Sequence, residues 1–216
     1  MKTNLALVHE PTFWPFFSWR EFSLMPDRAR MVVIIPVTGF TDWNASLPLD
    51  FEEQFLLTLL RETLAGMETS RRFLVIPPQR FNLGTKARSF FTVDPETAHA
   101  TLEEVVRSIH GPGFRKVLFL NSNPLNEDLV DSAGRDLRIA LGLQPFCINL
   151  GSIGLDWESP DGLERMTALA SNLRGEGSPS ADSAELTAQL ASLLEEVRQF
   201  RALPDEGAIP RKKALS

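Results

Sequence analysis

The 216-residue chain contains one cysteine, three histidines and no tyrosine. A single thiol, Cys147, excludes an internal disulfide framework and any zinc site built on several thiolates. The histidines, His9, His99 and His110, leave few candidates for imidazole-based metal binding or acid–base catalysis. This composition favours a reducing, cytoplasmic setting and points away from a histidine-rich catalytic centre.

Positive charge and long apolar runs are also scarce. Lysine and arginine number 22 against 28 aspartates and glutamates, which gives a net charge of −6. This excess of negative charge argues against a general phosphate-binding surface, so we expect no nucleic-acid partner. No run approaches the roughly 20 apolar residues of a membrane span, and no basic stretch followed by an apolar core opens the chain. We therefore expect no membrane partner.

Strand and helix patterns alternate along the chain. A continuous β-branched run at residues 31–37 predicts a central strand buried on both faces, and helical apolar spacing follows at 51–64. Further strands are predicted at 72–76, 116–120 and 146–150, and further helices at 95–110, 129–141 and 184–201. This alternation predicts an α/β sandwich with a mainly parallel sheet.

The two ends of the chain differ from this pattern. The first 30 residues are rich in aromatics and broken by prolines, which predicts an arm with a short helix near 18–24 that packs on its own core or on another subunit. We expect one domain over residues 1–203, arm included, and a flexible tail at 204–216. Ligands of parallel sheets bind beyond the carboxyl ends of the strands, here the loops at 38–50, 77–92, 121–126 and 151–160.

Several motifs, in order, resemble the creatininase (creatinine amidohydrolase) family. Residues 18–22 (SWREF) resemble its opening helix, and residues 33–37 its first strand. Residues 47–49 (LPL) resemble the end of its motif EQHGPHLPL, and residues 113–121 (GFRKVLFLN) are similar to its GFRRVLLVNGHGGN. The resemblance covers residues 17–200. It implies a three-layer α/β/α sandwich, a metal-dependent amidohydrolase ancestry and assembly into hexamers.

The metal ligands of that family are largely replaced. Its active members hold two divalent metals, partly through a histidine and an acidic residue of NGHxEN. Here the segment reads NSNPLN, so Asn121 and Asn126 match the outer asparagines while Asn123 stands for the histidine and Leu125 for the acidic residue. Leucine has no donor atom, and an amide oxygen is a weak partner for zinc.

The first motif aligns in two ways, both of which lose ligands. One alignment places Thr41, Trp43 and Ser46 at the glutamate and two histidine positions, whereas the other places Asp42 for the glutamate and Asn44 for a histidine. The aspartate that follows LPL in the family corresponds to Glu52, or alternatively to Asp50. The family's later HAGE motif falls on residues 160–163 and keeps only its glycine.

The resemblance and its departures together favour a family member that has lost the dinuclear metal centre. We expect a small-ligand-binding or scaffold subunit without a cofactor, acting as a homo-oligomer or with an active relative, its ligand an amide-bearing small molecule. The alternative is a divergent amidohydrolase that cleaves a C–N bond of an amide or cyclic amide with a weakly bound divalent cation, Mg²⁺, Mn²⁺ or Zn²⁺. The expected pocket residues are Asp42, Trp43, Asn44, Glu52, Asn121, Asn123, Asn126 and Trp157.

Overall fold

The computed structural model describes residues 7–83, 89–176 and 180–201. The predicted tail at 204–216 lies outside the described residues. At the centre is a parallel sheet in the order β3 (Phe73–Val75), β1 (Val32–Thr38), β8 (Lys116–Asn121) and β9 (Gln144–Asn149). A two-residue strand, β4 (Gln79–Arg80), pairs with the end of β1 in the same direction.

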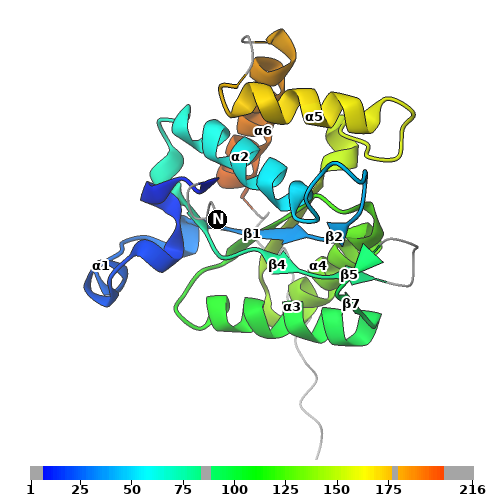
Figure 1. The fold of residues 1–216 in the computed structure, drawn as a ribbon. Coiled ribbons are helices and arrows are strands. Elements are labelled where there is room, and N and C mark those ends of the chain that lie inside the picture. The colour runs from blue at the N-terminus through cyan, green and yellow to red at the C-terminus, as the bar shows by residue number, and fades with distance from the viewer. Residues whose placement is uncertain (1–6, 84–88, 177–179, 202–216) are drawn as a thin grey trace, which may run out of the picture.

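Helices cover both faces of this sheet, which confirms the three-layer α/β/α sandwich (Figure 1). One face carries α2 (Phe51–Ala65), α5 (Gly162–Leu173) and α6 (Ala181–Gln199), and the other carries α3 (Pro95–His110) and α4 (Glu127–Leu141). Right-handed crossovers explain the split, because the chain runs from β1 to one neighbour through α2 and then to the opposite side through α3 and α4.

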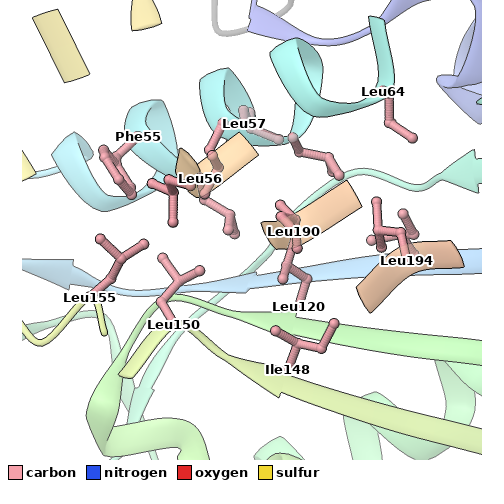
Figure 2. Packing of buried hydrophobic residues seen from close by; sticks show 14 of the residues in the cluster. Phe55, Leu56, Leu57, Leu64, Leu120, Ile148, Leu150, Leu155, Leu190 and Leu194 are labelled. Atoms are coloured by element: carbon pink, nitrogen blue, oxygen red, sulfur yellow. The ribbon is translucent and has the colours of Figure 1, made fainter. Parts of the chain in front are cut away.

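Two apolar cores result from the alternation of side chains along β1. All seven residues of this strand are buried. Val32 and Ile34 belong to the core beneath α2, α5 and α6, whereas Val33 and Ile35 belong to the core beneath α3 and α4. Figure 2 shows the first core, where leucines of α2 and α6 lie over Leu120. The continuous β-branched run is thus explained by a strand buried on both faces.

Local signals set several helix ends. Asp94 accepts a hydrogen bond from the Thr97 amide at 2.8 Å, and Pro95 occupies the first position of α3. Gly142 ends α4 with a left-handed φ of 63°. Helix α5 was not predicted, although its buried residues are spaced as in an amphipathic helix. Single-turn 3₁₀ helices connect the larger elements: η2 (Glu10–Thr12), η3 (Trp14–Phe16), η4 (Arg28–Arg30), η5 (Ser70–Arg72), η6 (Pro124–Asn126) and η7 (Leu150–Ile153).

The aromatic arm packs largely on the chain's own core. Phe13 is buried and bridges to Val75 of the edge strand β3. Trp14 stacks on Phe22 of the short helix α1 (Trp19–Ser23), with ring centroids 4.8 Å apart. Trp19 remains 80% exposed. Within the described ranges, no helix is long and apolar enough to cross a membrane.

Four short strands close the carboxyl edge of the sheet. Strand β2 (Phe40–Thr41) pairs antiparallel with β6 (Ser89–Phe90). Strand β5 (Asn82–Leu83) pairs in parallel with β7 (Thr92–Val93). These pairs bring the loops that follow β1 and β3 together at the edge where parallel sheets bind ligands.

Candidate functional site

The candidate site lies where the strand order of the sheet reverses direction. The chain leaves β1 toward β3 on one side and later returns to β8 on the other, so the crevice between the ends of β1 and β8 is the topological switch point. The register places Val37 of β1 beside Asn121 of β8, and Asn121 beside Asn149 of β9. Residues that follow these positions therefore converge at this crevice.

Glu52, in the first turn of α2, is the central carboxylate of the site and is fully buried. Its Oε1 accepts a hydrogen bond from the indole Nε1 of Trp43 at 2.6 Å, and its Oε2 accepts one from the backbone amide of Gly39 at 3.0 Å. The side-chain nitrogen of Asn123 lies 3.1 Å from both oxygens. Both carboxylate oxygens are thus engaged by N–H donors of three residues.

Burial raises the pKa of Glu52 from 4.5 to about 7. Removal from water penalises the charged carboxylate, while the hydrogen bonds from Asn123, Gly39 and Trp43 favour it and offset part of this penalty. A buried carboxyl group that titrates near neutrality can hold or release a proton under ordinary conditions.

The hydrogen-bond network fixes the orientation of the Asn123 amide. Its Oδ1 accepts from the backbone amide of Leu125 at 2.9 Å, so Nδ2 faces Glu52 and also donates to Oδ1 of Asn82 at 2.9 Å. The nitrogen of Asn82 donates in turn to the carbonyls of Phe40 at 2.7 Å and Phe90 at 3.1 Å. If either amide were turned by 180°, its oxygen would face acceptor oxygens and its nitrogen would face N–H donors.

Gly39 is required because the backbone passes directly against these amides. A Cβ at this position would lie 1.9 Å from Oδ1 of Asn82 and 2.1 Å from Nδ2 of Asn123. No side chain fits there without displacing one of the two amides. The glycine therefore allows its own amide to reach Glu52.

Two further asparagines support the loop after β8. Asn121 donates to the carbonyl of Asn123 at 2.8 Å and to Oδ1 of Asn149 at 3.0 Å, and it accepts from the Asn123 amide at 3.2 Å. Asn126 donates to the carbonyl of Phe81 at 2.9 Å. Within the described part of the chain, its buried Oδ1 has no hydrogen-bond partner.

A tryptophan pair covers one side of Glu52. The rings of Trp43 and Trp157 stack with centroids 5.3 Å apart and an interplanar angle of 15°. Trp157 is buried, donates from Nε1 to the carbonyl of Ser122 at 2.7 Å, and meets Phe51 and Phe55 edge-on. Trp43 is only partly buried, so it is the outer member of the pair.

Most of the expected pocket residues gather here, but not all of them. Asp42 is partly buried in the loop after β1, and Asn44 is exposed, with its Oδ1 accepting from the Ser46 amide at 3.0 Å as in a turn. The sequence prediction missed Asn82, Asn149 and the role of the Gly39 amide. Their only signal was their position at or just beyond the carboxyl ends of strands that meet at one edge.

The donors around Glu52 do not suit a divalent metal. Within residues 7–83, 89–176 and 180–201, no three histidine, cysteine or acidic side chains are grouped so as to hold an ion. Metal ligands must present lone pairs, whereas Asn123 and Trp43 present N–H groups to the carboxylate.

Cys147 lies on β9, where burial raises the pKa of its thiol to about 12.

Comparison with known proteins places this geometry in context. A family model described as "Creatininase: Creatinine amidohydrolase" matches residues 16–207. None of the curated proteins matches the chain.

Solved structures of creatininases share the fold. A mutant creatininase complexed with creatine has a TM-score of 0.61 and 14% identity over 87% of this chain and 99% of its own. A structure named "Creatininase Mn" has a TM-score of 0.55 and 16% identity over 92% and 82% of the two chains. A further mutant creatininase has a TM-score of 0.55 and 15% identity over 77% of this chain. The chain spans only 65% of the length of that last protein.

Proposed function

Because the chain belongs to the creatininase (creatinine amidohydrolase) family, we propose that it uses the family fold without a dinuclear metal centre, as a small-ligand-binding or scaffold subunit. The observation that carries this proposal is the orientation of Asn123. Its amide nitrogen faces Glu52, while its oxygen is engaged by the Leu125 amide. The position at which the resemblance expects a metal-binding histidine therefore presents protons to the carboxylate.

A cation would have to break this arrangement to bind. Entry of a divalent ion beside Glu52 would cost the hydrogen bonds from Asn123, Gly39 and Trp43, and rotation of the Asn123 amide would also break its bonds to Leu125 and Asn82. In return the ion would gain one carboxylate and one neutral amide oxygen. This exchange is unfavourable for zinc and weak for harder cations.

Aromatic surface near the site supports a binding role. Trp43 presents the outer face of its stacked ring, and Phe40 packs edge-on against Phe91 with centroids 5.0 Å apart. Phe91 is 69% exposed. These aromatic surfaces suit a small amide-bearing ligand, and they equally suit contact with another copy or with an active relative.

The test of the proposal is metal content combined with a thermal-shift titration. We expect freshly purified protein to hold substoichiometric metal and to gain no thermal stability from Zn²⁺, Mn²⁺ or Mg²⁺, because an ion that binds the native state raises the melting temperature. One or two metal ions per chain, retained through dialysis, would overturn the proposal.

Asn123→Asp provides a sharp comparison, because it replaces the amide nitrogen with an oxygen of the same size. Two carboxylates would then face each other at the Glu52 position, so we expect this variant to gain stability with Mn²⁺ where the wild type does not. Creatine and creatinine serve as ligand probes in the same assay. Light scattering, with and without an active creatininase, measures assembly.

A divergent amidohydrolase is the second candidate, and the pKa of Glu52 near 7 favours it. A general acid–base group works best when it titrates near the operating pH. In this case creatinine or another cyclic amide would be hydrolysed in the presence of Mn²⁺, and Glu52→Gln would abolish the activity. Activity that survives Glu52→Gln would exclude this role for the residue.

A further inference from the structure

The opposite edge of the sheet, where the strands begin, gathers positive charge. Lys116 is the first residue of β8, Arg72 immediately precedes β3, and Arg30 lies two residues before β1. Together with Arg115, Arg198 and Arg201 they line a cavity of about 890 Å³, and none of the described residues that line it carries a carboxylate. We propose that this cavity binds a small multivalent oxyanion, either a phosphate ester or a polycarboxylate.

The charge of these cations is only partly balanced. Arg72 lies 3.7 Å from Asp27, and Arg198 forms an ion pair with Glu195. Arg115 donates instead to the backbone carbonyls of His110 at 3.2 Å and Phe114 at 2.8 Å.

Arg30, Lys116 and Arg201 have no ion pair with any residue that the structure describes. The cavity therefore concentrates unpaired positive charge on a chain whose net charge is −6.

Lys116 fixes a charge at the floor of the cavity. Its ammonium donates to carbonyls at the C-terminal end of α6, those of Val197 at 3.3 Å and Arg198 at 2.6 Å, and to that of the capping residue Phe200 at 2.7 Å. Burial lowers the pKa of Lys116, and repulsion from Arg198 and Arg201 lowers it further. Lys116, Arg198 and Arg201 line the same cavity, and an anion bound there would relieve the repulsion between them.

The remaining lining suits a small ligand. Phe200 is 49% exposed and offers a ring face beside the charges. The volume falls in the range of cavities that hold small molecules, and arginine forks match the paired oxygens of phosphate and carboxylate groups.

This cavity is separate from the candidate site. The two lie at opposite ends of strands that are six or seven residues long, a separation of about 20 Å. The proposal therefore stands or falls independently of the role of Glu52.

Titration calorimetry with pyrophosphate and with citrate, at constant ionic strength, tests the proposal on the full chain. The informative variant is Arg30→Gln with Arg201→Gln, because both side chains are exposed and neither forms an ion pair with a described residue. Loss of two charged contacts should weaken binding by about tenfold or more. The matched control, Arg20→Gln with Arg135→Gln, removes the same charge from exposed positions outside the cavity and should change affinity less than about twofold.

Each outcome decides the matter. Binding that the cavity variant weakens and the control does not supports the proposal, and the preferred anion identifies phosphate or carboxylate as the source. Absence of binding by both anions, or equal weakening in both variants, would overturn it. A single-stranded oligonucleotide that binds more tightly than pyrophosphate and is lost in the cavity variant would overturn the assignment to a small molecule.

Discussion

Replacing Glu52 with glutamine should remove a pH dependence of stability that the site builds into the fold. The carboxyl group titrates near 4.5 in the unfolded chain and near 7 in the native state, because burial favours its neutral form. The native state therefore binds this proton more tightly, and stability falls as pH rises between these values. At about 1.4 kcal/mol per pH unit, the loss amounts to roughly 3 kcal/mol.

Urea unfolding between about pH 4.5 and pH 8 measures this effect. Trp43 donates its indole N–H to Glu52 and stacks on Trp157, so two of the four tryptophans whose fluorescence follows unfolding lie at the site. The stabilising contribution of the proton is complete below pH 4.5 and lost above pH 7. We therefore expect the wild type to lose about 3 kcal/mol more than Glu52→Gln over this interval.

A control separates this carboxyl group from the rest of the titration. Glu104→Gln removes a glutamate that is 79% exposed, and its stability should follow the wild type at every pH. Glutamine at position 52 also places an N–H₂ group among donors, which costs stability at all pH values without changing the slope. Parallel curves for the wild type and Glu52→Gln would refute the reasoning.

Three further predictions follow from individual contacts. Gly39→Ala should lower the free energy of unfolding, measured with denaturant, by about 3 kcal/mol, because its Cβ would displace the Asn82 or Asn123 amide. The control Gly66→Ala should lower it far less, because a Cβ there has no atom nearer than 3.6 Å. Equal losses in the two variants would contradict the close approach at Gly39. Lys116→Met should lower the free energy of unfolding by about 2 kcal/mol, since three carbonyls at the end of α6 lose their charged donor. An unchanged denaturation midpoint would show that Lys116 does not stabilise this helix end. The thiol of Cys147, with a pKa of about 12, should react with iodoacetamide at pH 8 much more slowly in native than in urea-unfolded protein, and equal rates would show that it is accessible and ionised.

The main layers of the fold were predictable because their signals are local. The β-branched run of β1 and the Asp94-Pro95 start of α3 follow from strand burial and helix capping. Helix α5 was not predicted, because its apolar spacing is present but no capping side chain marks its start. The two-residue strands could not be predicted, since their pairing depends on which loops the sheet brings together.

The candidate site was predictable only in part for the same reason. Glu52 and Asn123 stand at motif positions, whereas Asn82 carries no motif and is defined by the amides it meets across the crevice. The basic cavity could not be predicted from the sequence, because the net charge of the chain is negative. Its cations also come from segments that are far apart in the sequence and meet only where the strands begin.

Because helix α6 is the last described element of the chain, the two faces of the sheet can be covered at different times during synthesis. The face beneath α3 and α4 has all its elements once β9 ends at residue 149, whereas Leu120 and Ile148 on the other face are covered by Leu190 and Leu194 of α6 (Figure 2). Residues 150–199 must be synthesised before α6 can cover this face, which takes roughly 3 to 10 seconds at about 5 to 20 residues per second. During that interval α2 is already made, but the part of the face that α5 and α6 cover stays exposed. Exposed apolar surface of this kind promotes aggregation, so we expect the ribosome-bound protein to be most vulnerable before its last helix emerges.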